Sequence, residues 1–320
     1  MRIIQSLCVA LLVGFSAFSN AAQTNDKQEV KSILITGAST GIGRHLAEAL
    51  ASDGYHVYAG ARKKEDLDAL NAIENITAVR LDVTIQEEVD AAVAFIRSKN
   101  TGLYALVNNA GIGGGGPIVE TAIDDQSFVY QVNVEGVYRT TKAFAPLVIE
   151  SKGRISTTGS IAGTISGQGY SAYSGSKHWI EAFTDALAAE MESKGVQVSV
   201  IEPGNYQTQI RRSSVKRMFD KVQSAGGEIT EQMQEIYANA EKRELSFKKP
   251  DEVTAAYMHA LFDEKPLRRY VVTPNQSEQE RTIGTAVKRL VQLNQWGPHT
   301  YTRDQLVEML DKALAEEAKK

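Results

Sequence analysis

Three side chains in the middle of the chain could together move a proton to or from an oxygen atom. Tyr173 and Lys177 are four residues apart, so on a helix their side chains share one face. The charge of the lysine would favour the phenolate and lower the pKa of Tyr173 from its usual value of about 10. The hydroxyl of Ser160 would hold a substrate oxygen beside the phenol. The set suits proton transfer at an alcohol or ketone oxygen, provided that another group moves the hydride.

The Tyr-x-x-x-Lys spacing is not diagnostic by itself. The chain has 12 Tyr among 320 residues, and the same spacing recurs at Tyr138 and Lys142. A half-buried helical tyrosine beside a solvated lysine is the ordinary structural explanation for either pair. The elements around each pair must therefore decide which of them does chemistry.

Short apolar runs alternate with helical stretches from residue 30 onward. We expect strands at 32–36, 56–60, 78–81, 103–107, 154–157, 196–201 and 269–272, and helices at 43–52, 63–72, 86–98, 125–149 and 174–194. This alternation requires right-handed crossovers and a parallel sheet covered on both faces. The predicted fold class is α/β, a doubly wound parallel sheet (Rossmann fold) in a single domain over 30–273, with a C-terminal helical extension.

Two long segments exceed what the sheet needs. Residues 209–249 carry scattered apolar residues at the carboxyl end of the sixth strand, which is typical of a lid over a ligand crevice. A surface helical pair with its own small core is the alternative. Residues 274–320 carry apolar residues at helical spacing, which predicts amphipathic helices packed on the domain or on a partner subunit.

The first 22 residues have the pattern of a targeting segment. Arg2 gives a short positive region, residues 3–18 are largely apolar, and small residues follow at 19–21. A signal peptide is predicted, and an uncleaved anchor that associates with a membrane is the first alternative. The second alternative is a misplaced start, because a chain beginning near Val30 would open directly on the first strand.

Composition excludes several classes of function. The net charge is −4 and no basic stripe is interleaved with aromatic residues, so nucleic-acid binding is not expected. The single cysteine, Cys8, lies in the N-terminal segment, which removes disulfides, cysteine nucleophiles and cysteine-ligated metals from the body. The five His have no metal-binding spacing, so no metal site is expected.

A glycine-rich turn directly follows the first predicted strand. The glycines between Thr36 and Gly43 permit a tight turn and a close approach of the backbone to a pyrophosphate. At the end of the second strand an acidic residue would bind the ribose 2′-hydroxyl of NAD, whereas an arginine would accommodate the 2′-phosphate of NADP. Arg62 stands there, and no carboxylate follows until Glu65. We therefore expect NADP(H), with NAD(H) as the alternative.

Taken in order, these residues resemble the motifs of the classical short-chain dehydrogenase/reductase (SDR) family over about residues 31–272. By motif order, the resemblance implies that the catalytic residues are Ser160, Tyr173, Lys177 and Asn133. Tyr138, from the second Tyr-x-x-x-Lys pair, lies on the helix that starts near Asn133 and does not follow a serine-bearing strand. The resemblance also implies the cofactor-binding residues Gly37, Ser39, Thr40, Gly41, Ile42, Gly43, Arg62, Asp82, Val83, Asn109, Ala110, Gly111, Tyr173, Lys177, Pro203, Gly204, Tyr206 and Thr208.

Three features depart from the pattern of the family. Thr40 stands where NADP-preferring members often carry a basic residue, which weakens the NADP prediction. Tyr206 replaces a small aliphatic residue, which would narrow the nicotinamide side or stack on it. The four glycines at 113–116 suggest either a mobile loop beside the substrate or a permissive turn.

The implied activity is reversible hydride transfer between NADP(H) and a carbonyl or alcohol substrate, and the apolar lid favours a lipophilic one. Lys177 would also bind the nicotinamide ribose, and Asn133 would position a water relay behind the lysine. The alternatives are an NAD-dependent alcohol dehydrogenase of the same fold, a non-catalytic NADP-binding sensor or scaffold, and a nucleotide-sugar epimerase. The enzyme is expected to be a homodimer or homotetramer. The N-terminal segment favours export or inner-membrane association, whereas a need for NADPH favours a cytoplasmic catalytic domain.

Overall fold

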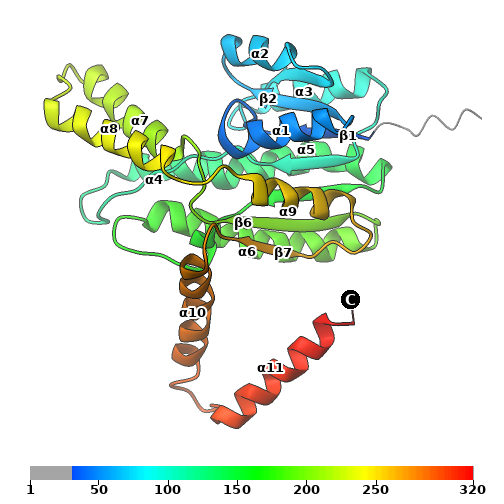
Figure 1. The fold of residues 1–320 in the computed structure, drawn as a ribbon, viewed down its shortest axis with the longest axis vertical. Helices are drawn as coiled ribbons and strands as arrows, with labels where there is room; N and C mark the ends of the chain where they lie inside the picture. The colour runs from blue at the N-terminus through cyan, green and yellow to red at the C-terminus, as the bar shows by residue number, and fades with distance from the viewer. Residues whose placement is uncertain (1–30, 320) are drawn as a thin grey trace, which may run out of the picture.

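Seven parallel strands form one sheet in the order β3-β2-β1-β4-β5-β6-β7, as the computed structural model shows for residues 31–319 (Figure 1). The predicted targeting segment 1–22 lies outside the described residues. The strands are β1 (Ser32–Ile35), β2 (His56–Ala61), β3 (Ile76–Arg80), β4 (Ala105–Asn108), β5 (Arg154–Thr158), β6 (Gln197–Pro203) and β7 (Arg269–Val272). The strand order reverses between β1 and β4, the point at which such sheets bind ligands. The predicted fold class and single domain are confirmed.

Helices cover both faces of the sheet because successive side chains of a strand point to opposite sides. Ile33 and Ile35 belong to one buried cluster, together with residues of α1 (Gly41–Ser52), α2 (Lys64–Asn71) and α9 (Asp251–Phe262). Leu34 belongs to the other cluster, together with residues of α3 (Gln86–Ser98), α5 (Gly136–Glu150) and α6 (Ser171–Glu192). All four residues of β1 are buried. This two-sided burial is typical of a central parallel strand.

The prediction of a single long helix at 125–149 is wrong in one respect. The segment consists of α4 (Ile123–Tyr130), a π-helix, η1 (Gln131–Glu135), and then α5. The π-helix contains Asn133, whose side chain is buried and hydrogen-bonded to Ile112 and Ser176. Single π-helical turns of this kind are frequent at functional sites, and apolar periodicity does not predict them.

The segment at 209–249 contains a helical pair that projects from the body (Figure 1). The helices are α7 (Ile210–Ser224) and α8 (Glu231–Leu245), and the rings of Phe219 and Tyr237 meet between them at 5.9 Å. The two helices thus pack against each other, as expected for the alternative of a surface helical pair with its own small core. The first turns of α7 also line the cleft described below.

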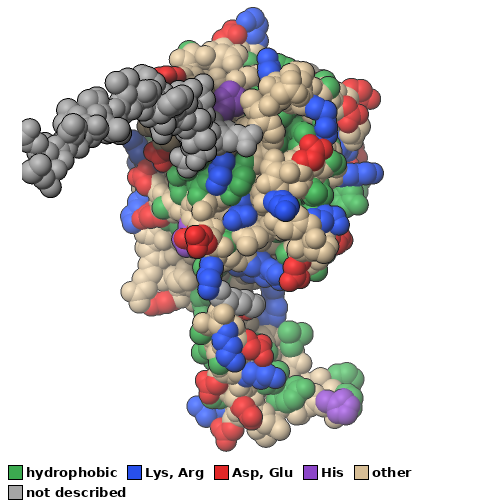
Figure 2. Space-filling view, turned by 90° about the vertical axis from the view of Figure 1, so that its right-hand side faces the viewer, with side chains coloured by type: hydrophobic (Ala, Val, Ile, Leu, Met, Phe, Trp, Pro, Cys, Tyr) green, Lys and Arg blue, Asp and Glu red, His purple; other side chains and the backbone are tan. Residues whose placement is uncertain are grey.

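Two further helices, α10 (Gln276–Leu293) and α11 (Arg303–Glu317), extend away from the body as an arm (Figures 1 and 2). Near the start of α10, Glu278 accepts hydrogen bonds from the backbone N–H and side chain of Asn205, and farther along Arg289 donates to the carbonyl of Thr164. Many apolar side chains of the arm are exposed, including Val287, Leu293, Trp296, Leu310 and Leu314. Among residues 31–319, no helix combines the length and hydropathy that a membrane crossing requires.

Candidate active site

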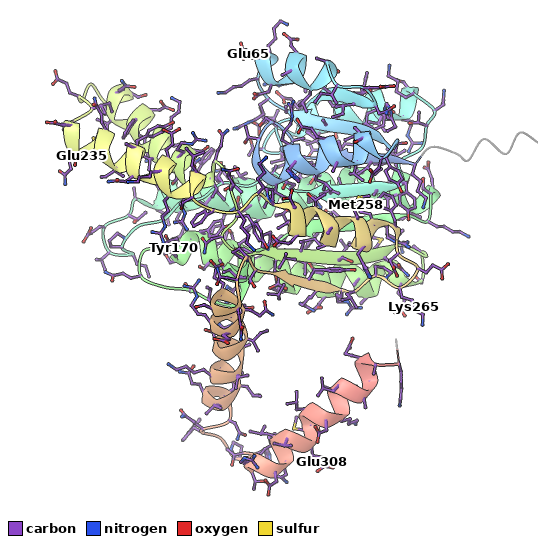
Figure 3. The ribbon with its side chains drawn as sticks, viewed as in Figure 1. Glu65, Tyr170, Glu235, Met258, Lys265 and Glu308 are labelled. Carbon is purple, nitrogen blue, oxygen red and sulfur yellow. The ribbon has the colours of Figure 1, made fainter. Side chains whose placement is uncertain are left out.

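A cleft of about 1040 Å³ lies at the carboxyl ends of the strands, between the glycine-rich turn and the first turns of α7. Its walls include the predicted cofactor residues from Gly37 to Ile42, Asn109 directly after β4, and the residues after β5 and β6. The predicted cofactor residue Gly43 is buried in α1 and does not line the cleft. Figure 3 shows Tyr170 on the side of the sheet from which α7 and α8 project, with Met258 and Lys265 toward the opposite end. The volume is at the upper end of what small-molecule sites have.

The glycine-rich turn lacks side chains where the backbone is most crowded. A Cβ atom on Gly37 would lie 2.7 Å from the Cα of Ala110, and one on Gly43 would lie 2.3 Å from the side-chain nitrogen of Asn109. Gly37 and Gly41 also have positive φ angles, of 65° and 61°. A larger residue at these positions would therefore strain the turn or force its neighbours to move.

The start of α1 leaves its first N–H groups free to bind an anion. Thr40 precedes the helix and its side chain makes no capping hydrogen bond. Uncapped N–H groups and the positive end of the helix dipole together favour a phosphate. Because the turn also excludes side chains, the backbone present here fits a dinucleotide pyrophosphate.

Hydrogen bonds join this turn to the end of β4. The hydroxyl oxygen of Thr36 accepts from the backbone N–H groups of Asn109 and Ala110, both at 3.0 Å. In return the side chain of Asn109 donates to the carbonyls of Thr36 and Gly37, also at 3.0 Å. The polar atoms at the switch point are thereby fixed before any ligand binds.

The end of the cleft next to β2 carries a charged pair. Arg62, at the end of β2, lies 3.3 Å from a carboxylate oxygen of Asp82, and its own side chain is 57% exposed. Burial opposes ionisation of Asp82, but hydrogen bonds from Thr84 and the charge of Arg62 lower its pKa. A guanidinium thus stands at the predicted ribose position, and most of it is accessible.

The serine, tyrosine and lysine come together at the near end of the cleft. Ser160 follows β5, and its hydroxyl accepts from the N–H of Ala162 in the short 3-10 turn η2 (Ile161–Gly163). Tyr173 and Lys177 project from α6, and the ammonium lies 5.7 Å from the centre of the tyrosine ring. The Ser160 hydroxyl also lies close enough to the phenol to act on its pKa.

The pKa of Tyr173 moves opposite to the direction predicted from the sequence. Burial of the phenol raises its pKa, and this outweighs the lowering by the Ser160 hydroxyl and by the charge of Arg211. Burial also lowers the pKa of Lys177 to about 8. Its ammonium donates to the carbonyl of Thr158 at 2.7 Å. The net direction predicted for the Tyr173 pKa is therefore wrong, because desolvation is the larger effect.

The amide of Asn133 holds the loop that follows β4. Its oxygen accepts from the N–H of Ile112 at 2.8 Å, and its nitrogen donates to the carbonyl of Ile112 and to the hydroxyl of Ser176, both at 3.0 Å. Both N–H donors of the amide are therefore used within the protein. A Cβ atom on Gly111 would lie within 4 Å of both this amide and the Lys177 ammonium, so the asparagine sits close behind the lysine.

The residues predicted at the end of β6 and directly after it line the cleft. Pro203, Gly204 and Thr208 line the wall, and Thr208 packs against the glycine turn, with its Cβ 3.4 Å from where a Cβ on Gly41 would lie. Tyr206 also reaches the wall, but it is only 3% exposed and belongs to the core cluster beside α1 and α9. The stacking role predicted for its ring is therefore wrong: the ring packs into the core.

The four glycines at 113–116 lie in a loop that packs closely against neighbouring segments. A Cβ on Gly114 would lie 2.6 Å from Val129, and one on Gly115 would lie 2.3 Å from the carbonyl of Gly169. Gly115 also has a φ of 145°. Close approach of neighbouring chain segments accounts for glycine at 114 and 115.

Comparison with known proteins identifies the family. The family model for short chain dehydrogenases matches residues 31–218. The chain belongs to the short-chain dehydrogenase/reductase family. It is accordingly an NAD(P)-dependent oxidoreductase that acts on CH–OH groups.

One curated relative and two solved structures illustrate the similarity of this SDR enzyme to known proteins. It is 37% identical over 217 residues to the mitochondrial D-beta-hydroxybutyrate dehydrogenase of Bos taurus, a match that covers 64% of this chain and 62% of the bovine protein, less than two thirds of its length. An actinorhodin polyketide ketoreductase solved with NADPH has a TM-score of 0.64 and 27% identity, covering 77% of this chain and 96% of that one. A Burkholderia phymatum SDR solved with NAD has a TM-score of 0.71 at 24% identity, covering 85% and 99%, and supports the fold alone.

Several residues that shape this SDR site were missed from the sequence. Thr36 and Thr158 act through a hydroxyl and a backbone carbonyl, and neither group has a sequence signature. Arg211 comes from α7 and influences Tyr173 through space. The four basic residues among 211–217 were the one available signal, because they stand in a segment already expected to form a lid.

Proposed function

We propose that this SDR enzyme transfers a hydride reversibly between NADP(H) and a lipophilic alcohol or carbonyl compound. The observation that carries the proposal is the convergence of the Ser160 and Tyr173 hydroxyls beside the buried ammonium of Lys177. This group of three lies in the same cleft as the glycine turn that fits a pyrophosphate. A sensor or scaffold would need the turn but not the acid–base group.

The protein handles the proton and the orientation of the substrate. Ser160 holds the substrate oxygen, and Tyr173 donates a proton to a carbonyl oxygen or removes one from a hydroxyl. The nicotinamide supplies or accepts the hydride when it is bound. Lys177 keeps a positive charge next to the tyrosine, which favours the phenolate that forms during the reaction, and it would hold the nicotinamide ribose when the cofactor binds.

Asn133 contributes a path for the proton to solvent. Both amide N–H groups are already used, so a water behind Lys177 would be held by the free lone pair of the amide oxygen or by backbone carbonyls of the π-helix. The same amide fixes Ile112, and through it the loop that borders the cleft.

NADP(H) is the proposed cofactor because Arg62 stands at the end of β2 with an accessible guanidinium. A 2′-phosphate would form charge-assisted hydrogen bonds with it, and no acidic residue replaces it at that position. The ion pair with Asp82 and the neutral Thr40 leave NAD(H) as the alternative. Relative affinities for the two cofactors decide between them.

A lipophilic substrate is supported by apolar side chains at the near end of the cleft. They come from the loops after β4 and η2 and from the lid, and they are Ile112, Ile165, Ile210, Val215, Ile236 and Phe247. Apolar walls with a few placed polar groups are typical of small-molecule sites. We also propose that the enzyme is a homodimer or a homotetramer.

We propose a signal or anchor role for residues 1–22. N-terminal sequencing of the native protein, together with cell fractionation, would test this role.

The decisive experiment uses both Tyr-x-x-x-Lys pairs. Tyr173→Phe removes the phenolic proton and should lower kcat on a ketone panel by about 10³-fold or more, with the NADPH dissociation constant unchanged within about threefold. Tyr138→Phe is the matched control, because Tyr138 is 57% exposed on α5 and should leave kcat unchanged. Substantial residual activity in Tyr173→Phe would contradict the assignment of Tyr173 as the residue that transfers the proton.

A further inference from the structure

The cleft is far more basic than the rest of the protein. The whole chain has a net charge of −4, yet the cleft is lined by six basic side chains and only two acidic ones. The basic residues are Arg62, Lys177, Arg211, Arg217, Arg243 and Arg281; the acidic ones are Asp82 and Glu244. A concave site lined by one sign of charge attracts ligands of the opposite sign. The cofactor phosphates account for the charge at the Arg62 end only.

Arg211 lines the same cleft as Tyr170 and Tyr173. It lies in the first turn of α7, and its guanidinium donates to the side-chain oxygen of Asn205 at 2.9 Å and to the Tyr170 hydroxyl at 3.4 Å. Its charge also acts on the Tyr173 phenol. The guanidinium is therefore held by neutral partners at the place where a substrate would meet the tyrosine.

The neighbouring arginine shows what a structural role looks like in this helix. Arg212 pairs with Glu241 and with Glu244, the second of which is only 1% exposed. The Glu244 carboxylate also accepts from the backbone N–H of Arg211 at 2.6 Å, which fixes the start of α7. Across residues 31–319, the Arg211 guanidinium has no carboxylate partner.

A half-buried guanidinium without a counter-ion is unfavourable unless a ligand supplies one. The side chain of Phe247 lies beside Arg211, with 6.0 Å between the guanidinium carbon and the ring centre, and Ile165 and Val215 line the same cleft. The site thus offers a cation next to an apolar wall. This arrangement fits a molecule with a negatively charged end and an apolar body.

We propose that Arg211 is a specificity-determining residue that binds a carboxylate carried by the substrate, so that the substrates are hydroxy acids and the corresponding oxo acids with apolar chains. This inference rests on the proposed oxidoreductase function and narrows its substrate class. The planar guanidinium suits a carboxylate because it donates two parallel hydrogen bonds. The apolar chain would then lie along the wall formed by Phe247 and its neighbours.

The test compares straight-chain hydroxy acids with their methyl esters, using the full-length enzyme and NADP⁺. Wild type should prefer the acids. Arg211→Gln should lower kcat/KM for the acids by about 50-fold or more relative to its effect on the esters, because a charge pair in a cleft is removed. Arg211→Lys should restore part of the preference for acids over esters, since lysine keeps the charge but cannot donate two parallel hydrogen bonds.

Lys216→Gln is the matched control, because it removes a charge from the same helix at an exposed position paired only with Asp220. It should leave the ratio of acid to ester turnover unchanged. Competitive inhibition by the unsubstituted fatty acid should weaken in Arg211→Gln to the same extent. An equal loss on acids and esters, or a wild-type preference for the esters, would overturn the carboxylate site but keep the oxidoreductase function. Failure of wild type on both panels and on ketones would overturn the proposed function itself.

Discussion

The ammonium of Lys177 donates a hydrogen bond of 2.7 Å to the backbone carbonyl of Thr158. Thr158 is the last residue of β5, two positions before Ser160, whereas Lys177 lies on α6 one turn after Tyr173. One side chain therefore fixes the serine-bearing strand end against the tyrosine-bearing helix. Catalysis needs these hydroxyls within hydrogen-bonding reach, and this contact sets their separation.

Lys177→Met should nearly abolish enzymatic activity, whereas the protein should remain folded. Loss of the charge beside Tyr173 should lower kcat by about 10²–10⁴-fold. The folded pKa is about 8, below the usual value of 10.5, so the folded state binds fewer protons between these pH values. Wild type should therefore gain stability relative to the variant as the pH rises from 8 to 10. Urea unfolding at several pH values measures this difference, and a constant difference would contradict the burial of the ammonium.

Arg62→Ala should change cofactor preference. Loss of the guanidinium should raise the dissociation constant of NADP⁺ by about 10–100-fold and leave that of NAD⁺ within about threefold. Lys63→Ala is the control, because Lys63 is an exposed neighbour of the same charge. Protein fluorescence titration with each cofactor gives both constants. Equal weakening of the two cofactors would show that Arg62 does not recognise the 2′-phosphate.

Two glycine-to-alanine changes should have opposite effects on stability. Gly43→Ala would place its Cβ 2.3 Å from the Asn109 side chain and 2.6 Å from the Gly37 carbonyl. It should lower the free energy of unfolding by about 1–3 kcal/mol and weaken cofactor binding. Gly284→Ala meets nothing within 4 Å inside α10 and should raise stability by about 0.5–1 kcal/mol. Denaturant unfolding measures both; a harmless Gly43→Ala would refute the close contact.

A buried carboxyl under the site should make stability depend on pH. Burial, and secondarily the charge of Glu181, raise the pKa of Glu202 to about 7, so the folded state binds more protons than the unfolded chain between pH 4.5 and 7. Stability should fall relative to Glu202→Gln as the pH rises through this window, by about 3 kcal/mol in total. The exposed Glu190→Gln is the control and should follow wild type. Parallel curves for wild type and Glu202→Gln would be inconsistent with the buried carboxyl.

The sequence was sufficient where a feature depends on local order along the chain. The strand at Arg269–Val272 and the helix at Gln86–Ser98 match their predicted bounds, because apolar periodicity reports the face that each element buries. The π-helix around Asn133 could not be predicted in this way. Its extra residue per turn is stabilised by contacts to Ile112 and Ser176, which are distant in sequence.

The sequence by itself determined the family, the glycine turn and the order of Ser160, Tyr173 and Lys177, because these depend on residue type and spacing. Only the tertiary structure decided the electrostatics of the site. Burial raises the pKa of Tyr173, and Arg211 reaches the phenol from a separate helix. Both effects depend on distance through space and on the exclusion of water, and neither quantity is encoded in the spacing of residues along the chain.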